Sequence, residues 1–390
     1  MKPTLKMSHP EKRSIVKIYQ LLAIVIAAVI FSNCRKEELS DPVLNSTTSV
    51  AFAIANTQLQ VDAGPVRRVV YSSSTSATLL GSGSDSGGLV TFKWTQTGGN
   101  STATIAKPTR DTTNVSGLKP GIYTFTLTVT DQSGTSRSDT TSVTVLKKMT
   151  WTIGGTTREA LVHLSTGSGQ APVIFAFHGH GGTDLGFAAK VFELEWPEAV
   201  VVYPQGLRTK SHQDPDGTKS GWQSSVGEVN SFTGIKDQDL KFFDAMLSTF
   251  KKSYNADSSR IFVHGWSNGG EFVYNVLWAA RGDKLAALSP AAAILGTTNG
   301  KKTLPVMHTA GTSDPLASFS YQQKTVQAVR TLDQCSTTGT TWATGADGLL
   351  GTHYWSSIAD PVIFLQYDGG HDYPSTVPPL IVKFFKQANL

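Results

Sequence analysis

The sequence predicts two folded domains: an all-β sandwich and, after it, a larger α/β domain with a mostly parallel sheet. The length of 390 residues suits two domains and a leader. Residues 51–147 are rich in Ser, Thr, Gly and Val and carry short alternating runs between turn signals, which is typical of a small β-sandwich. Residues 149–390 alternate apolar strand-like runs with helical segments, the pattern of βαβ units.

The first 50 residues are typical of an export signal and a tether. A basic segment ends at Lys17, and the apolar run from Leu21 to Phe31 has the length of a signal peptide rather than of a membrane-spanning helix. Cys34 follows this run and resembles the lipidated cysteine of a bacterial lipoprotein. The resemblance implies a signal peptide at 1–33, a flexible linker at 34–50, and an exported protein held by a lipid at the outer membrane or cell surface. An uncleaved N-terminal anchor helix is the alternative.

The positive charge of the chain does not indicate a nucleic-acid partner. The formal net charge is +5, but the first 33 residues hold five Lys or Arg and one Glu. The rest of the chain is therefore almost neutral and has no strong electrostatic attraction for a polyanion.

Alternation in the first domain predicts its core. Tyr123, Phe125, Leu127 and Val129 are spaced to face inward, with threonines between them facing solvent. This run and Trp94 with its neighbours resemble a PKD-type immunoglobulin-like domain. The resemblance implies an immunoglobulin-like sandwich in which Trp94 packs in the core, with stacking on a sugar as the alternative.

In the second domain, apolar runs bounded by turn signals predict buried strands. These runs are residues 172–177, 199–203, 260–264, 304–308 and 362–366. Residues 239–254 carry apolar side chains at helical spacing and predict an amphipathic helix packed on the sheet.

A strand-to-helix turn in this domain has the pattern of a nucleophile elbow. Gly265-Trp-Ser-Asn-Gly269 directly follows one predicted strand and precedes a helical segment. Such a turn exposes the hydroxyl of Ser267 at a helix N-terminus, where backbone amides favour developing negative charge. A structural glycine turn with an inert serine is the alternative.

A glycine-rich turn after another strand could complete an oxyanion site. His178-Gly-His-Gly-Gly182 follows the strand that ends at Phe177 and would expose backbone N–H groups. We expect one donor to be the N–H of His180 or a neighbour, and the other to be that of Asn268. Metal binding by His178 and His180 is the alternative, but no third ligand lies at a recognisable spacing, and we predict no metal or organic cofactor.

A serine nucleophile needs a base and an acid to orient that base. His371 lies in a loop after the last predicted strand and is the predicted base, while His308 and His353 are interpreted as structural. Asp314 follows the strand through His308, which yields the chain order Ser, Asp, His, and is the predicted acid. Asp360 and Asp368 are the alternatives because both lie near the histidine loop.

Together these motifs resemble the polyhydroxybutyrate depolymerase and feruloyl esterase group of α/β-hydrolases, which is similar to carbohydrate esterase family 1. The resemblance covers roughly residues 149–390 and includes Pro204-Gln-Gly206 and Leu285 to Pro290. The chain departs from that group in lacking its disulfide-forming cysteines.

The resemblance implies a serine carboxylic-ester hydrolase that acts through an acyl-enzyme on feruloyl or acetyl esters of plant polysaccharide. Trp222, in a long loop, and Trp266, beside the predicted nucleophile, are candidate substrate contacts, with a loop-anchoring role as the alternative for Trp222. Polyester depolymerisation and peptide hydrolysis are the alternatives with the same residues. A non-catalytic carbohydrate-binding surface lipoprotein is the alternative from another class.

Overall fold

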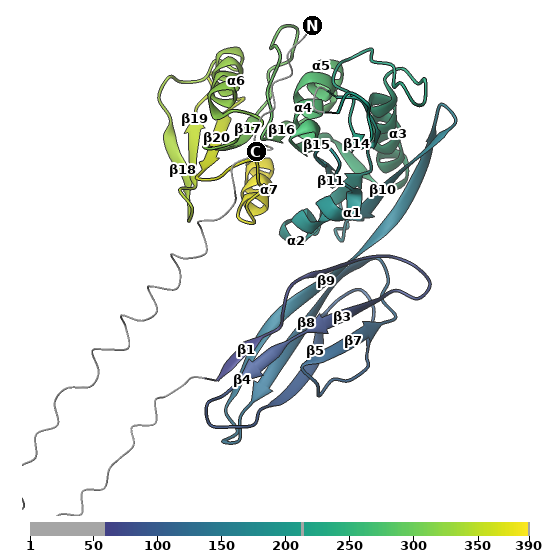
Figure 1. The fold of residues 1–390 in the computed structure, drawn as a ribbon, viewed down its shortest axis with the longest axis vertical. Helices are drawn as coiled ribbons and strands as arrows, with labels where there is room; N and C mark the ends of the chain where they lie inside the picture. The colour runs from purple at the N-terminus through teal and green to yellow at the C-terminus, as the bar shows by residue number, and fades with distance from the viewer. Residues whose placement is uncertain (1–58, 212–213, 389–390) are drawn as a thin grey trace, which may run out of the picture. The chain divides into compact units, whose positions relative to one another are not determined.

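The computed structural model describes residues 59–211 and 214–388 (Figure 1). The predicted signal peptide, the linker and the lipidation of Cys34 lie outside these residues. Within the described part of the chain, none of the helices combines the length and the apolar character needed to cross a membrane.

The first domain is an all-β sandwich. Strands β9, β8 and β5 form one antiparallel run, with β2 parallel to β9, while β3, β7 and β6 form a second sheet and β1 pairs with β4. The strands are β1 (Gln60–Asp62), β2 (Arg67–Val70), β3 (Ser76–Leu80), β4 (Ser82–Ser84), β5 (Thr91–Gly98), β6 (Thr104–Ile105), β7 (Thr112–Ser116), β8 (Gly121–Thr130) and β9 (Ser136–Ile153).

The predicted core of this sandwich is confirmed. Tyr123, Phe125, Leu127 and Val129 alternate along β8 and are fully buried, as their period-two spacing requires. Trp94 on β5 is only 2% exposed, and its indole N–H donates to the carbonyl of Asp111 at 3.0 Å. Trp94 therefore packs inside the sandwich and offers no face to a sugar.

One strand runs through the predicted domain boundary. β9 pairs with β8 through residues 136–145 and with β10 (Thr156–His163) through residues 147–153. The chain therefore passes from the sandwich to the second domain within a hydrogen-bonded strand rather than through a linker.

The second domain is built on a sheet in the order β18-β19-β20-β17-β16-β15-β11-β12-β10-β9. Its strands, besides β9 and β10, are β11 (Ala171–Phe177), β12 (Val200–Pro204), β15 (Ala256–Trp266), β16 (Ala287–Ala291), β17 (Val306–Gly311), β18 (Thr340–Thr344), β19 (Leu350–Tyr354) and β20 (Val362–Tyr367). A two-stranded piece, β13 (Leu207–Arg208) and β14 (Ser220–Gly221), lies outside it. All five predicted strands are present.

The α/β class is confirmed, but the expectation of a mostly parallel sheet needs correction. The central pairs from β20 to β12 are parallel, whereas β18, β19, β10 and β9 join antiparallel at the two ends. The sheet is therefore mixed. Only the central strands are apolar on both faces. Strands β18 and β19 at one end of the sheet are partly exposed and contain polar residues, so they lack the continuous apolar run by which buried strands are recognised.

Helices cover both faces of the sheet (Figure 1). Helices α3, α4, α5 and α6 pack on one face, and α1, α2 and α7 pack on the other. Their bounds are α1 (Asp184–Phe187), α2 (Phe192–Glu195), α3 (Gln238–Ser253), α4 (Asn268–Phe272), α5 (Trp278–Arg281), α6 (Phe319–Leu332) and α7 (Val377–Gln387), with a π-helical turn at Val273–Leu277 joining α4 to α5.

Successive side chains of each central strand point to opposite faces of the sheet and pack in two separate hydrophobic cores, one on each face. On β11, Val173 and Phe175 pack with α3 on one face, while Ile174 and Ala176 pack with the helices of the other face. The predicted amphipathic helix is α3, and its apolar residues are buried. The parallel strands point their carboxyl ends to one edge of the sheet, and the candidate site lies in the loops at that edge.

A buried carboxyl group at the end of α6 predicts a pH-dependent stability. Asp333 is buried, and neither of its oxygens has a well-formed hydrogen bond among the described residues. Burial, with the charge of Asp360 adding to it and the backbone N–H of Leu304 weakly opposing it, raises the pKa of Asp333 to about 8. Because the folded-state pKa is raised, the folded state loses stability through this group as pH rises from about 4 to about 8.

Replacing Asp333 with asparagine removes this ionisation. We expect the Asp333→Asn variant to unfold close to the wild-type temperature at pH 5 and several degrees above it at pH 9, a gain on the order of a few kcal/mol. Thermal unfolding followed by circular dichroism at both pH values measures the difference. Asp283→Asn, at an exposed aspartate, is the control. An equal shift at the two pH values would contradict the role assigned to the buried carboxyl.

Candidate active site

The loop between β15 and α4 holds Ser267 in a strained backbone conformation. Its φ of 55° and ψ of −125° lie outside the regions that side chains other than glycine favour. Two hydrogen bonds hold the turn: the N–H of Ser267 donates to Ala291 O at 2.9 Å, and the N–H of Glu271 donates to Ser267 O at 2.9 Å. The hydroxyl therefore stands at the start of a helix, as the elbow motif predicts.

The flanking glycines are required by close backbone approach. A Cβ atom on Gly265 would overlap the carbonyl of Gly269, and one on Gly269 would overlap the carbonyl of Phe177. Side chains at either position would push the strand, the helix and the neighbouring loop apart. These contacts explain the small residues two before and two after Ser267.

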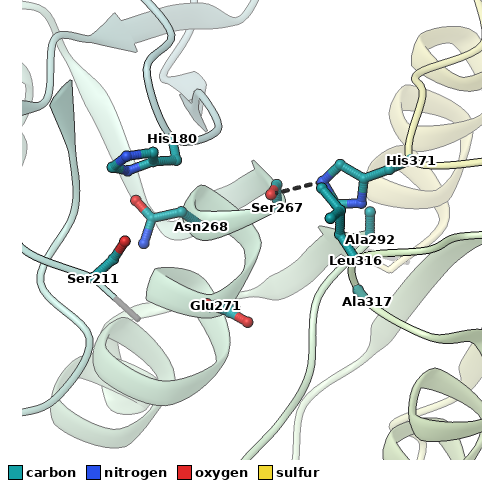
Figure 2. A pocket seen from close by; sticks show the side chains of 9 residues that line it. All are labelled: His180, Ser211, Ser267, Asn268, Glu271, Ala292, Leu316, Ala317 and His371. Carbon is teal, nitrogen blue, oxygen red and sulfur yellow. Dashed lines mark hydrogen bonds between the residues drawn. The ribbon is translucent and has the colours of Figure 1, made fainter. Parts of the chain in front are cut away.

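The structure brings Ser267, His371 and Asp314 together from three loops. Figure 2 shows the hydrogen bond between Ser267 and His371. His371 Nε2 lies 2.8 Å from Ser267 Oγ, and its Nδ1 lies 2.9 Å from Asp314 Oδ2. A carboxylate beside Nδ1 keeps the ring proton on that nitrogen, which leaves Nε2 free to accept the serine proton. Within the described ranges, the alternatives Asp360 and Asp368 make no hydrogen bond to His371.

Two tyrosines hold the loop that carries His371. Tyr367 donates its hydroxyl hydrogen to the carbonyl of Asp372 at 2.7 Å, and the Tyr373 hydroxyl lies 2.9 Å from His264 Nε2. Burial lowers the pKa of His264 to about 3, so this imidazole is neutral. Its Nδ1 faces the carbonyl of Ser289 and must carry the proton, so Nε2 accepts from Tyr373.

The carboxylate of Asp314 is buried behind His371 and is fully hydrogen-bonded. Its Oδ1 accepts from the backbone N–H groups of Leu316 at 2.8 Å and Ala317 at 2.9 Å. Its Oδ2 accepts from Gln322 Nε2 at 3.3 Å. These donors fix the orientation of the carboxylate toward His371 and stabilise its charge.

Gln322 is itself held by a buried chain of hydrogen bonds that the sequence did not reveal. His308 Nε2 lies 2.9 Å from Gln322 Oε1, and His308 Nδ1 lies 2.9 Å from the Tyr274 hydroxyl. Burial lowers the pKa of His308 to about 4, which keeps its imidazole neutral. Gln322 therefore links buried His308 to Asp314, the predicted acid. The sequence contains no local signal that separates Gln322 from the exposed polar residues of the same helix.

The glycine-rich loop after β11 lies against the nucleophile. A Cβ atom on Gly179 would come within 3.3 Å of Ser267 Cβ, so the glycine permits this approach. The N–H of Gly181 donates to Ser220 O, and that of Gly182 donates to Gly179 O. Within residues 59–211 and 214–388, the N–H groups of His180 and Asn268 have no acceptor, which leaves both available to an oxyanion.

The side chains of His178 and His180 have different partners. His178 Nδ1 donates to the carbonyl of Gly179, its Nε2 accepts from the N–H of Gly206, and burial lowers its pKa to about 4. His180 Nε2 lies 3.1 Å from Asp214 Oδ2. The described residues contain no group of three or more His, Cys, Asp or Glu side chains placed to hold a metal ion.

Trp222 does not reach the site, which corrects its prediction as a substrate contact. It is 1% exposed, its indole N–H donates to the carbonyl of His178 at 2.8 Å, and its ring packs edge-on against Phe177. Its backbone N–H donates to Asn268 Oδ1 at 2.8 Å. Burial of the indole ring, with its N–H group hydrogen-bonded, fixes the loop to the core of the domain. The alternative of a loop-anchoring role therefore fits the structure.

Trp266 packs against His371, with ring centroids 5.2 Å apart, and also against Tyr373. It lies next to the predicted base but does not line the cavity that opens over Ser267. A direct contact with substrate therefore stays a prediction for Trp266.

The cavity over Ser267 has a volume of about 220 Å³. Figure 2 shows Ser267 between His371 on one side and Asn268 and His180 on the other. The lining is mostly polar and is formed by His180, Ser211, Ser267, Asn268, Glu271, Ala292, Leu316, Ala317 and His371.

Comparison with known proteins separates the two domains. Residues 68–145 match the family model of a PKD domain. The chain is 29% identical over 126 residues to the bifunctional acetylxylan esterase/xylanase XynS20E of Neocallimastix patriciarum. The aligned segment is 32% of this chain and 16% of that protein. The chain is 27% identical over 161 residues to feruloyl esterase C of Emericella nidulans, which covers 40% of this chain and 55% of that protein.

A solved structure of a thermostable esterase is also similar, with 12% identity and a TM-score of 0.43 over 76% of this chain and 87% of that one. The chain spans at most about half the length of the two curated relatives described above. Residues 68–145 thus match a PKD domain, and part of the chain is similar in sequence to an acetylxylan esterase/xylanase and to a feruloyl esterase.

Proposed function

We propose that the second domain is a serine carboxylic-ester hydrolase that acts through an acyl-enzyme. The observation that carries this proposal is the series of hydrogen bonds from Ser267 Oγ through His371 to Asp314. Ser267 lines a cavity beside the backbone N–H groups of His180 and Asn268, which have no acceptor among the described residues. This arrangement has the parts that acyl transfer needs: a nucleophile, an oriented base and an oxyanion site.

The proposed reaction uses groups of the chain and water. Ser267 Oγ attacks the ester carbonyl carbon while His371 Nε2 takes the serine proton. The N–H groups of His180 and Asn268 donate to the oxyanion of the tetrahedral intermediate. His371 then returns the proton to the departing alcohol, which leaves the acyl group on Ser267. Water, deprotonated by the same imidazole, releases the acid and restores the serine.

We propose feruloyl or acetyl esters of plant polysaccharide as substrates. Two relatives support this choice through their names, one an acetylxylan esterase/xylanase and the other a feruloyl esterase. The polar lining of the cavity is compatible with an alcohol part rich in hydroxyl groups. Export and a lipid anchor at Cys34 are part of this proposal, because an insoluble polymer must be met outside the cell.

A side-by-side product assay tests the proposed function. The purified protein is incubated with acetylated xylan, feruloylated arabinoxylan and polyhydroxybutyrate, and acetate, ferulate and 3-hydroxybutyrate are quantified by chromatography, with the Ser267→Ala variant as blank. We expect acetate or ferulate above the blank. Release of 3-hydroxybutyrate alone would identify polyhydroxybutyrate, rather than a polysaccharide ester, as the substrate. Release of no acid from any substrate would favour a non-catalytic carbohydrate-binding protein.

A further inference from the structure

One acidic side chain lines the cavity itself. Glu271 lies on α4, and its backbone N–H donates to the carbonyl of Ser267, which places it one helical turn beyond the nucleophile. Figure 2 shows Glu271 at the lower side of the cavity, between the side of Ser211 and Asn268 and the side of Leu316 and Ala317. Asp314, in contrast, lies behind His371 and does not face the cavity.

The Glu271 carboxyl group has no hydrogen-bond partner among residues 59–211 and 214–388. Across the described ranges, no side chain or backbone group forms a hydrogen bond or ion pair with it. Two other polar side chains of the cavity wall have partners elsewhere: the Asn268 amide pairs with the backbone of Trp222, and the Ser211 hydroxyl accepts from the N–H of Asp214. Glu271 therefore differs from Asp314, which accepts hydrogen bonds from Leu316, Ala317, Gln322 and His371.

The Glu271 carboxyl group is partly buried and faces the cavity. Burial raises its pKa, while the neighbouring His371 imidazole acts in the opposite direction. Because no described residue donates to this carboxyl group, its hydrogen bonds come from what occupies the cavity, either water or a substrate. A substrate that displaces this water loses affinity unless it supplies a donor in its place, such as a hydroxyl group.

A role for Glu271 in proton transfer is not needed. His371 already contacts Ser267 Oγ and serves as base and acid in the proposed reaction. As a hydrogen-bond acceptor in the wall of the cavity, Glu271 can instead favour esters that carry a hydrogen-bond donor over esters that lack one.

We propose that Glu271 determines specificity by accepting a hydrogen bond from a hydroxyl group of the ester bound in the cavity. This inference rests on the proposed ester hydrolysis at Ser267 and names the feature of the substrate that the site selects. The hydroxyl belongs either to the sugar on the alcohol side or to a phenol on the acyl side, and both supply the same donor. Esters that lack a hydroxyl there leave the carboxyl unpaired and react more slowly.

Paired substrates measure this selection directly. Methyl ferulate is compared with methyl 3,4-dimethoxycinnamate, in which the phenol is capped, and methyl 2-O-acetyl-β-xyloside with its O-methylated analogue. The ratio of kcat/KM within each pair is the selectivity for the hydroxyl. We compare the wild-type protein with Glu271→Met, which has similar length but no acceptor, and Glu271→Gln, which keeps one acceptor oxygen.

We expect Glu271→Met to lower the selectivity of one pair by about 10–100-fold, the range that one hydrogen bond to a charged group supplies. Glu271→Gln should retain part of it. The pair that responds identifies the acyl side or the alcohol side as the source of the hydroxyl. Both variants should fold, because each removes a buried charge, and thermal unfolding checks this.

Unchanged ratios in both pairs, whether or not overall activity falls, would overturn the inference. A uniform loss on all four esters would assign Glu271 a structural role instead. Failure of the proposed function is seen separately: the wild-type protein would turn over none of the esters, or the Ser267→Ala variant would keep the activity.

Discussion

Replacing Ser267 with alanine is expected to lower kcat/KM for 4-nitrophenyl acetate by roughly 10⁴-fold or more. The hydroxyl is the atom that His371 Nε2 faces at 2.8 Å, and no second hydroxyl among the described residues of the cavity contacts that imidazole. Without Oγ, His371 can only deprotonate water, and the acyl-enzyme route is lost. Initial rates of 4-nitrophenol release by the two proteins measure the effect.

The fold of this variant should be intact, because the turn around residue 267 is held by backbone hydrogen bonds and by the flanking glycines. Ser253→Ala, at an exposed serine at the end of α3, is the matched control and should stay within about twofold of the wild type, as expected of a surface substitution far from the site. A Ser267→Ala protein that is folded and retains more than about a tenth of the wild-type rate would rule out the serine mechanism.

Replacing Asp314 with asparagine should lower kcat/KM by about 10⁴-fold at neutral pH while leaving the protein folded. Asparagine keeps an acceptor oxygen for the N–H groups of Leu316 and Ala317. Its amide nitrogen would take the place of Oδ2 and donate to His371 Nδ1. The imidazole would then carry its proton on Nε2, toward Ser267, and could not accept the serine proton.

The same measurement compares the candidate acids. Asp368 lies near the histidine loop in the sequence, but its carboxyl contacts Thr312 at 3.4 Å and not His371. Asp368→Asn should therefore stay within a few-fold of wild-type kcat/KM. A larger loss for Asp368→Asn than for Asp314→Asn would transfer the role of the acid to Asp368.

The residues changed in these variants lie in features that can be predicted from the sequence. The turn that carries Ser267 is local: five consecutive residues fold it, and each flanking glycine is needed because backbone atoms approach it closely. Loop residues that follow apolar strands can be placed at one edge of a parallel sheet by topology alone. The prediction of Ser267, His371 and Asp314 as neighbours used these two kinds of information together with the chain order Ser, Asp, His.

Other features depend on contacts between distant segments. Trp222 looks like a loop aromatic in the sequence, but the structure buries it against Phe177 and the carbonyl of His178. Gln322 reads as one more polar residue of a helix, yet it donates to Asp314 and is held by His308. Nothing local distinguishes these residues from exposed neighbours.

Local chain properties established the class of each domain, most of the buried strands, helix α3 and the glycine-bound turns, because hydrophobic periodicity and steric fit at a turn involve only residues close along the chain. The mixed edges of the sheet, the passage of β9 between two sheets, the burial of Trp222 and the lone carboxyl of Glu271 in the cavity emerged only from the folded chain. The partners of a strand, and the hydrogen-bond partners of a buried polar group, come from segments that are remote in the chain. The free energy of each pairing therefore depends on residues that the local sequence does not contain.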